Sequence, residues 1–229
     1  NTNLDGFHTI NGGGGTDTLS VSDATTVIDD DFTSITFVET IALANATNTV
    51  NLGAKADATG ITSVTGGTGT DTIVFAGGFD NATTVTLGNT NVNEVTLGLS
   101  TANTTITGGD AVDTITLGAG TSVVDAGGAN NVITAGAGAS TITAAGGVDT
   151  ITLGAGAATV TTGDGANQIT MGTGAVNITA GADVDTITID NGDLDATDTI
   201  NGAGSNDVLS TVGAITLADA AFTNITNVE

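Results

Sequence analysis

Between residues 108 and 188 the chain repeats one apolar position every nine residues. This position is Ile or Val in all nine copies: Ile115, Val124, Ile133, Ile142, Ile151, Val160, Ile169, Ile178 and Ile187. Thr follows it in all but one copy, and Gly or Ala fills much of the turn. A helix would need apolar residues three and four apart and would not tolerate so much Gly. The pattern therefore predicts three-residue strands such as "TIT", separated by six-residue turns, with the central side chain pointing inward.

Two nonapeptides make one coil, which predicts an all-β parallel β-solenoid (β-roll) with about 18 residues per coil. Turns nine residues apart then lie on opposite flanks, and turns eighteen residues apart lie on the same flank. One flank is expected to present carboxylates and amides: Asp113, Asn131, Asp149, Asn167 and Asp185. The other is expected to close with apolar side chains at the starts of its turns: Leu117, Ala135, Leu153 and Met171.

A much longer repeat frames this block. Residues 1–39 align without gaps with residues 191–229, and 20 of 39 positions are identical. We therefore expect a tandem array of units of about 190 residues, of which this chain is a piece. The predicted organisation is a first coil and tail in 1–44, an irregular solenoid with loops in 45–107, the regular block of nine nonapeptides in 108–188, and the start of the next unit in 189–229.

The charge balance limits the partners. Asp and Glu number 25 against a single Lys, which gives a net charge of -24. Such a chain repels nucleic acid and anionic membrane surfaces and attracts cations. No apolar run is long enough for membrane insertion. With no Cys, thiol chemistry leaves the compartment open.

Stacked carboxylates repel one another unless they are protonated, diluted or bridged, and Ca²⁺ bridges carboxylates, amides and backbone carbonyls. "GGGGTDTLS" (12–20) and "GGTGTDTIV" (66–74) resemble the RTX calcium-binding nonapeptide GGxGxDxUx, where U is a large apolar residue. The resemblance implies a parallel β-roll that holds Ca²⁺ between successive turns on one flank. It assigns the ligand position to Asp17, Asp71, Asp113, Asp149 and Asp185, with Asp207 as the counterpart of Asp17. Asn131 and Asn167 depart from the motif, and weaker or fewer calcium sites are expected there.

Further acids surround these positions. Asp110, Asp164 and Asp183 belong to turns of the same flank. Asp193, Asp195 and Asp198 crowd a break in the register and form a second calcium candidate, with a solvated acidic loop as the alternative. For the flank as a whole, an Asn/Asp ladder without metal is also open, because both residues favour tight turns and bond to their own backbone.

Catalysis has little support, because the single histidine, His8, has no thiol or serine motif beside it. The favoured function is a non-enzymatic, calcium-stabilised structural module of a secreted bacterial surface assembly, such as a surface layer, sheath, filament or adhesin stalk, which self-associates at the cell surface or outside the cell. One alternative is an ice-binding or surface-recognising adhesin module that uses outward Thr ladders such as Thr141, Thr143, Thr159 and Thr161. The other is a calcium-folding segment of a secreted RTX toxin or enzyme.

Overall fold

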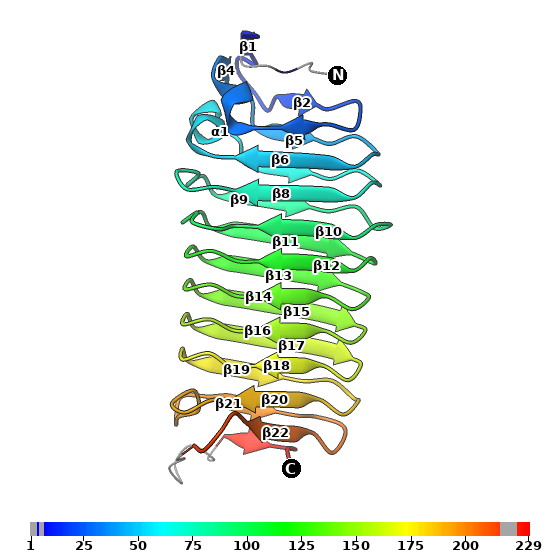
Figure 1. The fold of residues 1–229 in the computed structure, drawn as a ribbon, viewed down its shortest axis with the longest axis vertical. Helices are drawn as coiled ribbons and strands as arrows, with labels where there is room; N and C mark the ends of the chain where they lie inside the picture. Colours follow the sequence, from blue (N-terminus) through cyan, green and yellow to red (C-terminus); the bar gives the residue numbers. More distant parts are fainter. Residues whose placement is uncertain (1–3, 5–6, 216–223) are drawn as a thin grey trace.

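The chain winds into a stack of coils whose strands form two facing parallel sheets. The computed structural model describes residues 4, 7–215 and 224–229, so parts of both long-repeat copies lie outside the described residues. The long axis of the molecule runs from the N-terminal to the C-terminal end (Figure 1). The predicted parallel β-solenoid is confirmed.

The first sheet has ten strands within the described residues. They are β3 (Thr26–Val27), β6 (Asn48–Leu52), β8 (Asp71–Phe75), β10 (Asn93–Thr96), β12 (Asp113–Thr116), β14 (Val132–Thr134), β16 (Thr150–Thr152), β18 (Gln168–Thr170), β20 (Thr186–Ile189) and β22 (Val208–Thr211).

The second sheet has eleven strands in the described part of the chain. They are β2 (Thr18–Ser20), β5 (Thr40–Ala42), β7 (Ser63–Thr65), β9 (Thr83–Thr86), β11 (Thr104–Gly109), β13 (Ser122–Gly127), β15 (Ser140–Gly146), β17 (Ala158–Asp164), β19 (Val176–Thr179), β21 (Thr199–Asn201) and β23 (Ile225–Thr226).

The remaining elements lie near the N-terminal end. Strands β1 (Ile10–Asn11) and β4 (Ile35–Thr36) pair with each other. A 3-10 helix (Asp29–Phe32) and α1 (Ala54–Thr59) pack together on the flank where the chain leaves the ten-stranded sheet. The rings of Phe75 and Phe79 meet edge to face on this flank, with centroids 5.0 Å apart.

Coil length varies along the stack. Hydrogen bonds between successive coils join residues 18 apart from Asp113 to Asp185, as the sequence predicts. Before this block the spacing is 23, 22 and 20 residues, and after it 22. Extra residues bulge out in loops and α1 while the strands keep their register, so the solenoid continues through the irregular segment.

The strands are longer in one sheet than predicted. Strands β14, β16 and β18 have the expected three residues, but β15 and β17 have seven. Pairing continues past the strand into the following turn, where Gly146 lies opposite Asp164. The flank that follows the eleven-stranded sheet is therefore held by backbone pairing as well as by side chains.

The core lies between the sheets, and in the regular block each sheet contributes one inward column of aliphatic side chains. The nine periodic Ile and Val side chains are at most 1% exposed. The expected closure of the second flank is confirmed, because Leu117, Ala135, Leu153 and Met171 are all buried.

The glycines of this apolar flank stack directly on one another. A Cβ atom at Gly154 would collide with the carbonyl oxygen of Gly136 one coil earlier, and a Cβ at Gly172 would collide with that of Gly154. Close approach of the turn backbones, rather than a special dihedral angle, therefore requires Gly here.

Gly154→Ala should lower the free energy of unfolding by about 1–3 kcal/mol, because the added methyl overpacks a column of backbone. Gly146→Ala is the matched control, since its Cβ would meet nothing within 4 Å. Thermal or denaturant unfolding of both variants measures the difference. Equal stabilities would show that the turns do not stack as described.

Candidate metal-binding flank

One Asp or Asn side chain per coil is buried where the chain passes from the eleven-stranded into the ten-stranded sheet. Each is at most 1% exposed. We call this column the Asn/Asp ladder, and its members in order are Asn48, Asp71, Asn93, Asp113, Asn131, Asp149, Asn167, Asp185 and Asp207. Amide and acid alternate along it, so no two carboxylates are neighbours until Asp185 and Asp207.

The ladder is joined by hydrogen bonds from backbone to side chain. The backbone N–H of Asp113 donates to Oδ1 of Asn131 at 2.9 Å, and that of Asn131 donates to Oδ1 of Asp149 at 2.7 Å. Asp149 donates in the same way to Asn167 at 2.9 Å, and Asn167 to Asp185 at 2.8 Å. Asn and Asp therefore serve equally well through Oδ1, and they differ only in the second atom of the side-chain head group.

In the Asn turns the second atom closes the turn. Nδ2 of Asn167 donates to the carbonyl oxygens of Gly163 at 3.3 Å and Gly165 at 2.8 Å. Nδ2 of Asn131 likewise donates to two carbonyl oxygens of its own turn, those of Gly128 at 3.1 Å and Ala129 at 3.3 Å. These amides satisfy turn carbonyls that would otherwise face a buried side chain, so the Asn turns are complete without any ion.

In the Asp turns the second atom is an acceptor and cannot close the turn in this way. Oδ2 of Asp113 and Oδ2 of Asp149 are buried and have no hydrogen-bond partner among the described residues. At Asp71 and Asp185, Oδ2 accepts the backbone N–H of the Gly four residues earlier. The turns of Asp113 and Asp149 thus each contain one buried carboxylate oxygen that lacks a partner in the described structure.

Burial dominates the electrostatics of these carboxylates. Desolvation raises the pKa of Asp71, Asp113, Asp149 and Asp185 above the ordinary value of 3.8, and hydrogen bonds from the neighbouring Asn oppose the shift only in part. The charge of Asp207 adds to the rise at Asp185. A raised pKa means that the folded protein favours neutralisation of these groups, by a proton or by a cation.

This arrangement fits calcium at the Asp turns. Ca²⁺ takes six to eight oxygen ligands and accepts backbone carbonyls together with carboxylates. No group of three or more His, Cys, Asp or Glu side chains is brought together anywhere in the described residues, so a cation here would take most of its ligands from the turn backbone. Oδ2 of Asp113, Asp149 and Asp207 is buried without a hydrogen-bond partner in the described residues, so these three oxygens would be the side-chain ligands of such a cation.

The other acids of this flank lie at the surface. Asp110, Asp164 and Asp183 are exposed in the turns that contain the ladder. Asp183 accepts the backbone N–H of Gly165 at 2.9 Å. They add to the negative field of the flank, but they do not point into the ladder's buried column.

The acidic loop before β21 belongs to the opposite flank. Asp193 accepts the backbone N–H of Asp190 at 2.7 Å, and Asp198 accepts that of Asp195 at 2.7 Å and that of Val176 at 2.8 Å. Asp193 and Asp198 are buried caps of short turns, while Asp195 is exposed. A calcium site in this loop stays a prediction.

Asp17 lies apart from the other motif aspartates. It precedes β2 in the eleven-stranded sheet, on the flank that has Ser and apolar residues in the regular block and Asp198 near the C-terminal end. Its backbone N–H donates to Oε2 of Glu39 at 2.8 Å, and its Oδ2 is buried without a partner in the described structure. The single flank implied by the motif therefore does not include Asp17.

A comparison with protein families agrees with this geometry. The family described as the RTX calcium-binding nonapeptide repeat matches four copies, in residues 6–23, 101–124 and 125–160. These segments are RTX calcium-binding nonapeptide repeats. Comparisons with curated proteins and with solved structures find no match. In the described part of the chain, no helix is both long and apolar enough to span a membrane.

Sequence reasoning missed three members of these RTX-type flanks. Asn48 and Asn93 continue the ladder into the irregular segment, where insertions hide the nine-residue register, and Glu39 stands beside Asp17.

The alternation of Asp and Asn along the ladder can be recognised from the sequence alone. "VDTIT" recurs at 112–116, 148–152 and 184–188, every 36 residues, with an Asn turn between each pair. The Asn positions are therefore a regular feature and not a dilution of the motif.

Without divalent cations, acidification from neutral pH toward 3.8 should raise the melting temperature. The folded-state pKa values of Asp113 and Asp149 are raised, so the penalty for their buried charge disappears as the pH falls through those values. The double variant Asp113→Asn/Asp149→Asn should show a smaller rise, which separates the ladder from relief of the overall negative charge. Identical pH dependence in both proteins would contradict this assignment.

Proposed function

We propose that the chain is a non-catalytic, calcium-stabilised structural unit of a secreted bacterial surface assembly. The observation that supports this best is the pair of buried, unpartnered carboxylate oxygens on Asp113 and Asp149 inside RTX-type turns. A buried carboxylate without a partner costs stability, and a hard divalent cation removes that cost. Calcium, when bound, would supply the positive charge that the Asp turns lack.

Calcium is expected in alternate coils only. Asp113 and Asp149 would each hold a cation with carbonyls of their own turns, whereas at Asn131 and Asn167 the amide already occupies those carbonyls. Few carboxylate ligands per site place the affinity in the weak range of extracellular modules, about 10⁻⁴–10⁻³ M. Sites this weak favour a role outside the cell, where calcium would accompany folding.

A structural role follows from the shape and the repetition. Each coil contacts only its neighbours, so the solenoid gains length without gaining a new core. The repeat of about 190 residues extends the same architecture. The single Lys, Lys55, leaves almost no site for trypsin-like proteases, which suits an exposed polymer.

The adhesin or ice-binding alternative has less support. Thr side chains of β15 and β17 do point outward, at Thr141, Thr143 and Thr159 among others. The array is interrupted at once by exposed Val123 in β13 and by Asn177 in β19. Thr is also a favoured surface residue of strands in general, so the rows need no ligand to explain them.

Calcium should raise the melting temperature, and Asp149→Asn should lose part of that rise. A site held at a hundredfold excess over its dissociation constant contributes about 2.7 kcal/mol. In chelator Asp149→Asn should be at least as stable as the parent, because the buried charge is gone. Asp164→Asn, the same change at an exposed position of the flank, should keep the full calcium response. Equal melting of the parent protein in calcium and chelator would remove calcium from the proposal.

The assembly role has a separate test. Negative-stain electron microscopy of the calcium-saturated protein should show rods that join end to end as the concentration rises, because the outermost strands of both sheets have an edge that pairs with no strand of the described residues. A chain with the same calcium response that stays dispersed at every concentration would contradict the assembly role alone.

A further inference from the structure

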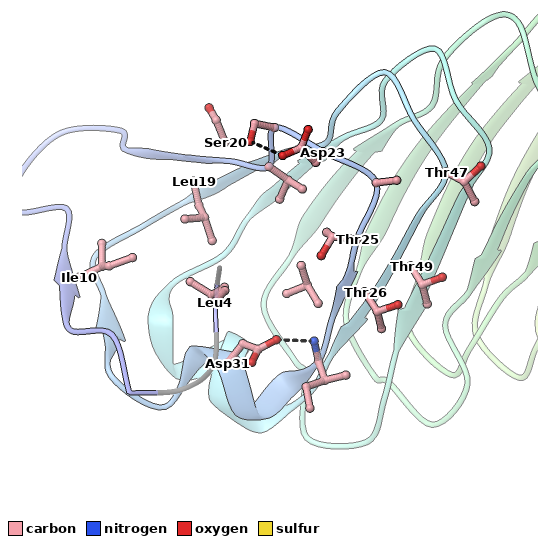
Figure 2. A pocket seen from close by; sticks show the side chains of 15 residues that line it. Leu4, Ile10, Leu19, Ser20, Asp23, Thr25, Thr26, Asp31, Thr47 and Thr49 are labelled. Carbon is pink, nitrogen blue, oxygen red and sulfur yellow. Dashed lines mark hydrogen bonds between the residues drawn. The ribbon is translucent and has the colours of Figure 1, made fainter. Parts of the chain in front are cut away.

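The N-terminal end of the solenoid core is open. A cavity of about 850 Å³ lies there, and its lining includes the apolar side chains of Leu4, Ile10 and Leu19 (Figure 2). Strands β2 and β3 are the outermost strands of their sheets at this end, and no other strand of the described residues pairs with their outer edges. An open apolar core bordered by free strand edges is a surface that another strand can cover.

The second copy of the long repeat shows what covers the same residues 190 positions later. Ile200, the counterpart of Ile10, is fully buried, and Leu194, the counterpart of Leu4, is 6% exposed. Ile10 and Leu4 remain partly exposed in the first copy.

The covering coil consists of β19 and β20. Ile178 of β19 lies opposite Ile200, and Ile187 of β20 lies opposite Leu209, the counterpart of Leu19. Four register pairs join β20 to β22. The chain thus contains both the surface that is open at its N-terminal end and the coil that fits this surface.

We propose that the N-terminal end is the docking surface for a coil equivalent to residues 176–189, supplied by a second copy of this unit. The proposal rests on the structural role proposed above and names the partner. β2 receives a strand equivalent to β20, and β1 receives one equivalent to β19. The apolar lining then closes over Ile178 and Ile187 of the incoming copy, as Ile200 and Leu209 do within this chain.

The two copies are related by a half-turn about the solenoid axis. β22 belongs to the ten-stranded sheet, but its counterpart β2 belongs to the eleven-stranded sheet. One long repeat therefore contains an odd number of half-coils. Across the junction, the ten-stranded sheet of one unit continues as the eleven-stranded sheet of the next.

This half-turn accounts for the position of Asp17. Its counterpart Asp207 ends the Asn/Asp ladder, where it accepts the backbone N–H of Asp185 at 2.7 Å. Asp17 is therefore the continuation of the ladder of the preceding unit, followed by Glu39. The acidic flank changes sides at every junction, so an array displays acidic turns on both of its edges in alternation.

Disulfide trapping tests both the docking and its register, because the chain has no Cys of its own. The full chain is preceded directly by a further copy of residues 1–190, with Thr188→Cys in the first unit and Ser20→Cys in the second. Thr188 lies opposite Ser210 in this structure, and Ser20 is the counterpart of Ser210. Residues opposite each other on paired strands are within reach of a disulfide, so oxidation should link the two positions.

Two variants sharpen the test. Without the half-turn, β2 would pair with β19, which belongs to the same sheet as β2, and Ser20 would then face Thr179. The first variant tests this alternative: Thr179→Cys replaces Thr188→Cys in the first unit, and Ser20→Cys stays in the second unit. The second variant is Thr188→Cys/Ser210→Cys in the 229-residue chain, which must form a disulfide if the assay reports the described pairing. A link from position 20 to position 179, or no link while this control forms, would overturn the proposal.

The result is independent of calcium stabilisation. Disulfide formation reports which strands are neighbours, whereas the melting experiments report metal binding. A Thr188–Ser20 link in a chain that melts equally in calcium and chelator would retain the junction and reject only the calcium role.

Discussion

A parallel solenoid places each side chain about 4.8 Å from its equivalent in the next coil. Any buried position therefore becomes a column of like neighbours, and a residue type that is acceptable once must be acceptable every 18 residues. Aliphatic side chains meet this condition easily, and Ile and Val fill both inward columns. A buried carboxylate does not meet it, because a column of negative charges would have neither solvent nor counterions.

The Asn/Asp ladder resolves this conflict by alternation. Oδ1 is present in both residues, so the hydrogen bond between coils is kept in every step. The amide nitrogen of Asn131 or Asn167 donates hydrogen bonds to the carbonyl oxygens of its own turn. A cation in an Asp turn would satisfy the equivalent carbonyl oxygens by coordination. Within the regular block, carboxylates remain only in alternate coils, at Asp113, Asp149 and Asp185. The RTX-type repeat is thereby divided into turns that are complete by themselves and turns that need a proton or a metal.

Much of this architecture could be predicted from the nine-residue period. Inward Ile and Val, the two kinds of flank and the parallel stacking all follow from positions such as Ile151 and Leu153 in a fixed register. Asn48 and Asn93 could not be placed, because loops of varying length separate them from the next coil while the backbone pairing stays intact. The flank of Asp17 was also hidden. It depends on whether a long repeat contains an odd or even number of half-coils, which local sequence does not reveal.

The alternation of amide and metal along one flank is the central claim, and anomalous diffraction at long wavelength from crystals of the calcium-saturated protein tests it most directly. The account predicts anomalous peaks beside Oδ2 of Asp113 and Asp149. It predicts none in the turns of Asn131 and Asn167, where the amide should keep its bonds to the turn carbonyls. Peaks of equal height in the Asn and Asp turns, or none in either, would contradict it.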